Sequence, residues 1–230
     1  MCHPSCLEFG QTILRREDIE GKSVIEVGAY DVNGSFRPIA QAFHPSSYLG
    51  VDITQGPGVD EICRAEDLLK QYGENRFDMV ICTEMLEHVL DWQLIVHNLK
   101  ALLKPEGCLV VTTRSEGFAY HGYPYDFWRY DIEDARHIFS DLKIERLEKD
   151  PMEPGVFLFA RKPKGFTEKQ IADHKLYAVL LKRRSSIIFM RYYWPLWHLK
   201  EQAKKRFRRE RERFTKERMV AKIRRMFGRA

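Results

Sequence analysis

Short runs of apolar, β-branched residues alternate with segments of helical periodicity through the first 163 residues of the chain. Apolar runs bounded by turn residues are typical of buried strands, whereas apolar residues three and four positions apart are typical of helices. Strands are predicted at 23–28, 48–53, 77–83, 107–113, 142–148 and 155–161. Helices are predicted at 7–14, 36–43, 66–72, 91–103 and 132–139, and Pro105 and Gly107 are expected to end the 91–103 helix.

Alternating strands and helices with nearly continuous apolar strands predict a mostly parallel sheet covered by helices on both faces. The last two strands differ, because only the short turn KDPMEPG joins 142–148 to 155–161. A link of that length has no room for a crossover helix, so these two strands are expected to be antiparallel. The predicted fold class is therefore α/β.

The character of the chain changes after Pro163. Residues 164–230 contain 21 Lys and Arg against 6 Asp and Glu, a formal charge of +15, with aromatic residues interleaved. Residues 1–163 contain 17 basic and 27 acidic residues, so this body carries a formal charge of −10. We predict one domain at 1–163 and a basic, aromatic, helical extension at 164–230, whose charge implies a partner.

Composition and cysteine usage narrow the class of protein. Apolar residues make up 44% of the chain, an ordinary share for a globular protein with a core. No apolar run approaches the roughly 20 residues that a membrane-spanning helix needs, and the N-terminus lacks a secretory signal pattern. Five scattered cysteines, an odd number, favour reduced thiols. These features predict a cytoplasmic protein, and the basic extension leaves a peripheral position at a membrane surface open.

The ends of the first two predicted strands carry the residues of a candidate nucleoside site. The first strand ends in VIEVGAYDVNGS, where Gly28 allows the backbone to approach a ligand closely. The second ends at Asp52, a suitable acceptor for the two hydroxyl groups of a ribose. The loop lacks the glycines of a pyrophosphate cradle, so it suits a nucleoside carrying an amino acid, with Glu26 or Asp31 near the ammonium group. The alternative is that Gly28 and Asp52 are ordinary turn residues.

Together with YLGVDI, AEDL, FDMVICTEMLEHV and LKPEGCLVVTT, this loop resembles the class I S-adenosylmethionine-dependent methyltransferases over about residues 7 to 162. The resemblance implies a Rossmann-like, seven-stranded sheet with one antiparallel strand and the cofactor at the carboxyl ends of the first strands. It places Gly28 against the methionine part, Asp52 at the ribose, and the backbone of Ala65 and Glu66 at the adenine. The cofactor-binding residues that it implies are Glu26, Gly28, Tyr30, Asp31, Asp52, Ile53, Ala65, Glu66 and Thr83.

The stretch EMLEHV, after strand 77–83, would place two glutamates and a histidine on one face if it turned as a helix. It resembles the ubiquinone-biosynthesis O-methyltransferases and the small-RNA 3′-terminal 2′-O-methyltransferases, in which a Glu-x-x-Glu-His set binds a divalent metal. The RNA enzymes add a later histidine. The resemblance implies Glu84, Glu87, His88 and His121 as ligands of Mg²⁺ or another divalent cation. Without a metal, the glutamates are solvated and His88 or His121 is the catalytic general base.

An aromatic loop could contact the methyl acceptor, and the basic extension could bind a partner. Residues 117–131 contain seven aromatic side chains, which either stack on an acceptor or form a structural lid. The extension would bind RNA through its charges and rings, or an anionic membrane surface. Its mixed charges also allow it to pack against the acidic body or a second subunit.

The function that these features favour is S-adenosylmethionine-dependent O-methylation of a hydroxylated small molecule or glycan. A metal-dependent RNA ribose 2′-O-methyltransferase, with the extension bound to RNA, is one alternative. An inactive adaptor that binds the cofactor and acts through its extension is the other. The sequence leaves the acceptor, the metal and the oligomeric state open.

Overall fold

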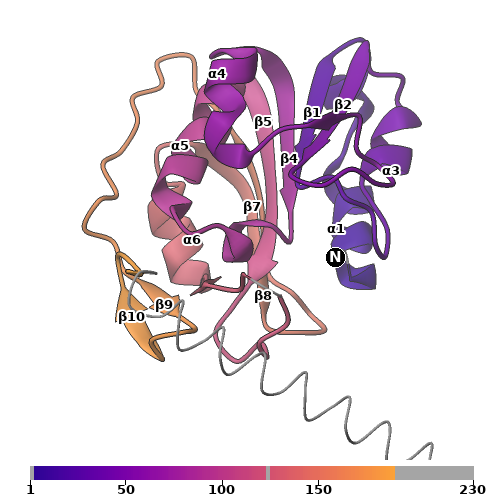
Figure 1. The fold of residues 1–230 in the computed structure, drawn as a ribbon. Coiled ribbons are helices and arrows are strands. Elements are labelled where there is room, and N and C mark those ends of the chain that lie inside the picture. The colour runs from indigo at the N-terminus through magenta and orange to yellow at the C-terminus, as the bar shows by residue number, and fades with distance from the viewer. Residues whose placement is uncertain (1–2, 123–124, 190–230) are drawn as a thin grey trace, which may run out of the picture. The chain divides into compact units, whose positions relative to one another are not determined.

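The protein is built around a seven-stranded sheet (Figure 1). The computed structural model describes residues 3–122 and 125–189. The strand order is β3-β2-β1-β4-β5-β8-β7, and all neighbouring pairs are parallel except the two that involve β8. The strands are β1 (Ser23–Val27), β2 (Ser47–Asp52), β3 (Glu61–Ile62), β4 (Phe77–Thr83), β5 (Leu103–Arg114), β7 (Lys143–Lys149) and β8 (Gly155–Arg161). This arrangement confirms the predicted α/β class and its single reversed strand.

Helices cover both faces of the sheet, as the alternation of strands and helices predicts (Figure 1). One face carries α1 (Pro4–Ile13), α2 (Arg16–Ile19) and α3 (Arg37–Gln41). The other carries α4 (Leu68–Tyr72), α5 (Trp92–Leu102) and α6 (Ile132–Ile138). Two short 3₁₀ turns, η1 (Ala65–Asp67) and η2 (Leu86–His88), follow β3 and β4. Both turns therefore lie at the carboxyl edge of the sheet.

Strand β4 shows why the sheet is apolar on both faces. Met79 and Ile81 belong to the core cluster beneath α1, while Val80 and Cys82 point to the opposite face. All four side chains are fully buried. Full burial of such an aliphatic side chain stabilises the fold by about 1.5–3 kcal/mol, so the continuous apolar run of β4 is explained by burial on two sides.

The predicted strands and helices are all present, and the differences concern their ends and some shorter elements. The 91–103 helix ends at Leu102, directly before β5, so Pro105 and Gly107 lie within that strand instead of ending the helix. The strand is irregular there, since Glu106 has a left-handed φ of +66°. The sequence did not predict the four-residue α2 or the two-residue edge strand β3, because elements of this length show no periodicity.

The segment after Pro163 also differs from the predicted helical extension. Residues 163–187, here called the strap, supply β9 (Leu176–Ala178) and β10 (Arg183–Ser185), which pair with β6 (Trp128–Arg129) in a three-stranded sheet of order β10-β9-β6. Leu176 is fully buried, and the Lys169 N–H donates to Asp141 at 3.0 Å. The compact unit therefore extends to Ile187. Most of the predicted extension, residues 190–230, lies outside the described residues.

The described cysteines and helices can be compared with the expected reduced thiols and the expected lack of a membrane-spanning helix. Cys63, Cys82 and Cys108 are buried free thiols, and Cys6 is buried as well. None of the helices within residues 3–122 and 125–189 has the length and apolar character that crossing a bilayer requires.

Candidate active site

The cofactor-side residues lie at the carboxyl ends of β1 and β2, which pair in parallel with Val27 opposite Val51. The chain turns sharply at Gly28, whose φ of +82° is a left-handed conformation that glycine adopts without strain. The Gly28 N–H donates to the Val51 carbonyl at 2.9 Å, and a Cβ on Gly28 would lie 2.8 Å from the Cβ of Met85. A side chain at position 28 would therefore collide with the segment that follows β4.

Glu26, near the end of β1, is buried beneath this loop. Its carboxylate accepts hydrogen bonds from the Ser35 hydroxyl at 3.0 Å and from the Tyr48 hydroxyl at 2.8 Å. Burial raises the pKa of Glu26, and these two hydroxyl groups oppose the shift. Asp31 shapes the same loop, because its Oδ1 accepts from the Gly34 N–H at 2.7 Å. Both acids were expected near an ammonium group. Glu26 is buried and hydrogen-bonded to Ser35 of the loop, whereas Asp31 is the more accessible of the two.

Asp52 ends β2 beside the glycine loop. Its carboxylate accepts from the Thr54 N–H at 3.0 Å and from the Tyr30 N–H at 3.4 Å. Tyr30 and Ile53 are exposed, with 40% and 58% of their surfaces accessible. A half-buried carboxylate with an aromatic and an aliphatic neighbour is suited to the hydroxyl groups of a ribose and to a planar base.

The turn expected at the adenine follows β3. β3 pairs with β2, with Ile62 opposite Asp52, so this turn lies next to the expected ribose position. The Asn98 side chain, from α5, donates to the Ala65 carbonyl at 2.8 Å and to the Glu66 carbonyl at 3.3 Å. Asn98 is buried and fixes the turn. Sequence reasoning missed Asn98, although an amide on the buried side of an apolar helix was an available signal.

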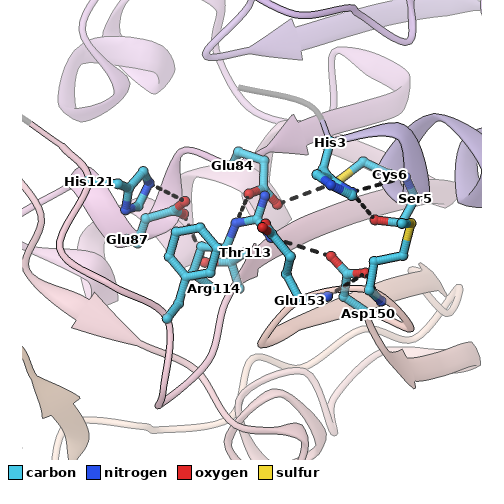
Figure 2. A network of polar contacts seen from close by, with 12 residues as sticks. His3, Ser5, Cys6, Glu84, Glu87, Thr113, Arg114, His121, Asp150 and Glu153 are labelled. Carbon is cyan, nitrogen blue, oxygen red and sulfur yellow. Dashed lines mark hydrogen bonds and ion pairs between the residues drawn. The ribbon is translucent and has the colours of Figure 1, made fainter.

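The segment TEMLEHV does not form the helix that would gather its charged side chains on one face. β4 ends at the buried Thr83, and Glu84 then has a left-handed φ of +52°. Only the 3₁₀ turn η2 follows, from Leu86 to His88. Figure 2 shows the consequence, since the side chains of Glu84 and Glu87 leave the strand end in different directions.

Glu84 forms a buried ion pair with Arg114, the last residue of β5 (Figure 2). The same guanidinium lies 3.3 Å from Asp150 and 3.3 Å from Glu153. Burial, followed by the charge of Glu87, raises the pKa of Glu84 to about 7, although Arg114 opposes the shift. The structure thus places this predicted metal ligand against a cation of the protein itself, apart from the other three.

Three of the predicted ligands do converge. One ligand atom from each of Glu87, His88 and His121 lies within 4.8 Å of the other two. The Nε2 of His121 lies 3.7 Å from Oε1 of Glu87 (Figure 2). The Nε2 of His88 lies 3.8 Å from the same oxygen. The Thr113 hydroxyl donates to the other oxygen of Glu87, Oε2, at 2.9 Å. Sequence reasoning missed Thr113, which only the pairing of β4 with β5 brings to this place.

The electrostatics of this group are unusual because Glu87 is completely buried. Its Oε1 has no hydrogen-bond donor among residues 3–122 and 125–189. A buried carboxylate oxygen left without a donor is costly, and two imidazole nitrogens face this one. The arrangement can therefore hold a divalent cation, or a proton on one of the histidines, at the end of β4.

Gly122 lets the aromatic loop approach His88. A Cβ at Gly122 would lie 2.4 Å from Cε1 of the His88 ring and 2.6 Å from the Tyr125 carbonyl oxygen. The structure shows a steric requirement for glycine beside the histidine.

Comparison with known proteins gives a family for this architecture. The chain matches the model of a methyltransferase domain over residues 5–149. The ubiquinone biosynthesis O-methyltransferase of Coxiella burnetii is 30% identical over 135 residues, which cover 53% of this chain and 53% of the relative. That of Haemophilus ducreyi is 31% identical over 126 residues, which cover 46% and 51%. The chain therefore spans about half the length of the curated relatives it matches.

Solved structures share the fold at low sequence identity. An S-adenosylmethionine-dependent methyltransferase from Mesorhizobium loti has a TM-score of 0.52 at 18% identity, and the match covers 67% of this chain and 96% of that one. The 1,6-didemethyltoxoflavin-N1-methyltransferase of Burkholderia thailandensis has a TM-score of 0.54 at 15% identity, with coverages of 68% and 78%. Because the family model spans more than half of the chain and the sheet has the expected reversed strand, the chain belongs to the methyltransferase domain family, in the class that uses S-adenosylmethionine.

Proposed function

We propose that this protein transfers the methyl group of S-adenosylmethionine to an oxygen atom of a hydroxylated small molecule or glycan. The observation that carries the proposal is the convergence of Glu87, His88 and His121 at the end of β4, the strand next to β1. Gly28 and Met85 are in close contact, so the cofactor side and the acceptor side share a boundary. An acceptor held by the three residues would lie beside the methyl group of the cofactor.

The relatives support oxygen as the acceptor atom, since they are named as O-methyltransferases of ubiquinone biosynthesis. The Burkholderia structure contains S-adenosylhomocysteine, which supports the choice of cofactor. The acceptor is argued from the site itself. Tyr120 and Tyr125, on the aromatic loop, are about two-fifths exposed, at 41% and 37%, and offer rings on which a flat acceptor or a sugar can stack.

Glu87, His88 and His121 fit a divalent cation. One carboxylate oxygen and two imidazole nitrogens are donors that Mg²⁺, Mn²⁺ or Zn²⁺ accept, and open positions remain for the acceptor. The donor separations of 3.7 and 3.8 Å suit ligands held about 2.1 Å from one ion. A bound cation would lower the pKa of the acceptor hydroxyl. Glu84 stays outside this set as long as Arg114 holds it.

The protein's own groups would carry out the transfer. When no cation is bound, the Nε2 of His88 or His121 would accept the proton of the acceptor hydroxyl as the oxygen attacks the methyl carbon. The oxygen–carbon bond forms while the carbon–sulfur bond breaks, so the sulfonium charge is lost and S-adenosylhomocysteine leaves. Glu87 stabilises the resulting imidazolium, and the hydrogen bond from Thr113 holds Glu87 in place.

A second candidate is 2′-O-methylation of RNA. It is favoured by the histidine from the aromatic loop, His121, and by the formal charge of +15 on residues 164–230. A basic segment with interleaved aromatic residues can neutralise phosphates and stack on bases. An adaptor without activity is the third candidate, and it requires cofactor binding with no transfer.

A transfer assay tests these proposals together. Full-length protein and radiolabelled S-adenosylmethionine are added to a cell extract with Mg²⁺ or EDTA, and the label is followed into RNA, protein and organic-soluble fractions. EDTA-sensitive label in small molecules or glycans would support the first candidate, and label in RNA the second. Cofactor binding without label in any fraction would contradict both and favour the adaptor.

A further inference from the structure

Two consecutive residues of the aromatic loop face the histidines of the site. The Nδ1 of His88 lies 2.5 Å from the carbonyl oxygen of Tyr125. A carbonyl oxygen only accepts hydrogen bonds, so this contact assigns the ring proton to Nδ1 and leaves the lone pair of Nε2 toward Glu87. The Nδ1 of His121 lies 3.2 Å from Oδ2 of Asp126, at ion-pair distance but without the angle of an aligned hydrogen bond, and the backbone N–H of His121 donates to the same oxygen at 2.9 Å.

Asp126 has the properties of an orienting group. It is buried, and the Arg129 guanidinium contacts both of its oxygens, at 2.5 Å and 2.9 Å. Because the Arg129 cation contacts both oxygens, Asp126 is paired as a carboxylate and presents an acceptor to Nδ1 of His121.

Arg129 connects this carboxylate to the rest of the molecule. It is fully buried in β6, and its guanidinium also donates to the carbonyl groups of Phe118 at 3.3 Å and Ala119 at 3.2 Å. β6 pairs with β9 of the strap, with Arg129 opposite Tyr177. The orientation of Asp126 is thus fixed by the guanidinium of Arg129, which is buried on β6 and hydrogen-bonded through all three of its nitrogens.

We propose that Asp126 is a positioning residue that keeps His121 protonated on Nδ1, so that its Nε2 stays directed at Glu87 and the acceptor. Arg129 has a supporting part, since it holds the carboxylate in place. The inference rests on the proposed function, in which His121 is a metal ligand or a base. An ion pair that only anchors the loop would not select between the two forms of the ring.

Proton–nitrogen correlation spectra of the imidazole rings, recorded on metal-free, full-length protein at alkaline pH, distinguish these forms. We expect Nδ1 to be protonated in both His88 and His121. The Asp126→Asn variant should move His121 to the Nε2-protonated form and leave His88 unchanged, since the Tyr125 carbonyl remains. A His121 ring that is protonated on Nε2 in the wild type, or that ignores the substitution, would overturn the proposal. A change in both rings would mean that Asp126 and Arg129 only anchor the loop, and it would also overturn the proposal.

The variant Asp126→Asn leaves Arg129 buried without a counter-charge, which can unfold the loop. The double variant Asp126→Asn/Arg129→Gln pairs two neutral amides instead and should show the same change at His121. Mn²⁺ titration, followed by electron paramagnetic resonance, should give about 10- to 100-fold weaker binding in both variants. Equal Mn²⁺ affinity would count against the proposal. No Mn²⁺ binding by the wild type would contradict the proposed metal, and the ring spectra would still decide the role of Asp126.

Discussion

The two sides of the site are assembled from different distances along the chain. On the cofactor side, the predicted residues lie at or near the ends of paired strands, as Asp52 does at the end of β2. On the acceptor side, Glu87 is held by Thr113 from another strand, and His121 lies on a loop that β6 and β9 support. The comparison shows that strand ends reveal the candidate residues of the cofactor side in the sequence, whereas the acceptor side also depends on a loop that a second, small sheet supports.

Removal of the strap should have the largest effect on stability. It should remove support from the acceptor side and leave the cofactor side in place. Phe127 links the strap to the site, since its carbonyl accepts from the Val179 N–H and its N–H donates to the Glu87 carbonyl, both at 2.8 Å. A chain of residues 1–163 also loses the buried Leu176 and Ala178. It should aggregate or melt lower by about 10 °C or more.

A chain of residues 1–189 is the matched control for this truncation. It retains the contacts that the strap makes within the described residues and should melt like the full-length chain. Thermal unfolding followed by circular dichroism measures both. Equal melting temperatures for the two shortened chains would show that the strap does not support the acceptor side.

Glu87→Gln should impair transfer most among the point variants. The neutral amide keeps the shape of the side chain but removes the charge that both histidines face at 3.7 and 3.8 Å. We expect methyl transfer to fall on the order of 10²-fold or more, with unchanged affinity for S-adenosylmethionine. Initial rates and calorimetric titration of the cofactor make the test. A loss of cofactor affinity would mean that the two sides are not independent.

Asp52→Ala should produce the opposite pattern. Loss of a charged acceptor for two ribose hydroxyls should weaken cofactor binding by about 10- to 100-fold, since such hydrogen bonds contribute about 1.5–3 kcal/mol. Mn²⁺ binding by the Glu87 group should not change. Titration calorimetry with each ligand separates the two effects, and unaltered cofactor affinity would remove Asp52 from the ribose site.

Gly122→Ala should have a smaller effect on the acceptor side. The added methyl group would lie 2.4 Å from the His88 ring, so the ring or the loop must shift. Misplaced catalytic groups lose rate steeply, and we expect about tenfold slower transfer with an unchanged melting temperature. Gly165→Ala is the control, because a Cβ there meets no atom of the described residues within 4 Å. Equal rates in the two variants would contradict the steric requirement at Gly122.

The smallest expected effect is on the pH dependence of stability. Burial and the charge of Glu87 raise the pKa of Glu84 from 4.5 to about 7. Between these values the folded protein binds more protons than the unfolded chain, so the free energy of unfolding falls as pH rises through this window. In Glu84→Gln this decline should be shallower between about pH 5 and pH 8. Urea unfolding at both values measures it, and parallel declines would contradict the raised pKa.

The sheet could be predicted, and the residues proposed for the cofactor could be located at strand ends, because their signals are local. A run such as FDMVICT shows burial on two faces, and Glu26 and Asp52 are conspicuous acids at the ends of such runs. The family resemblance implied a seventh strand without locating it, because the two residues of β3, Glu61 and Ile62, are too few to show alternation.

The acceptor side could be predicted only in part, because its geometry depends on backbone reversals and distant pairing. Helical spacing implied that Glu84 and Glu87 act together, but the left-handed φ at Glu84 separates them. Asp126 and Arg129 stand three residues apart in DFWR, where opposite charges fit an exposed turn as well as a buried pair. The strap has three-residue strands with no periodic pattern. Only the fold shows that these pieces meet.

The position of β8 has a consequence for the synthesis of the protein. β8 is the last of the seven strands in the chain, yet it lies inside the sheet, between β5 and β7. Domains fold while they emerge from the ribosome, and an unpaired strand edge invites pairing with other chains. Until Gly155–Arg161 has emerged, the nascent chain exposes the edge of β5. Chaperones that shield strand edges would therefore act on this protein mainly in the interval between the emergence of β5 and that of β8.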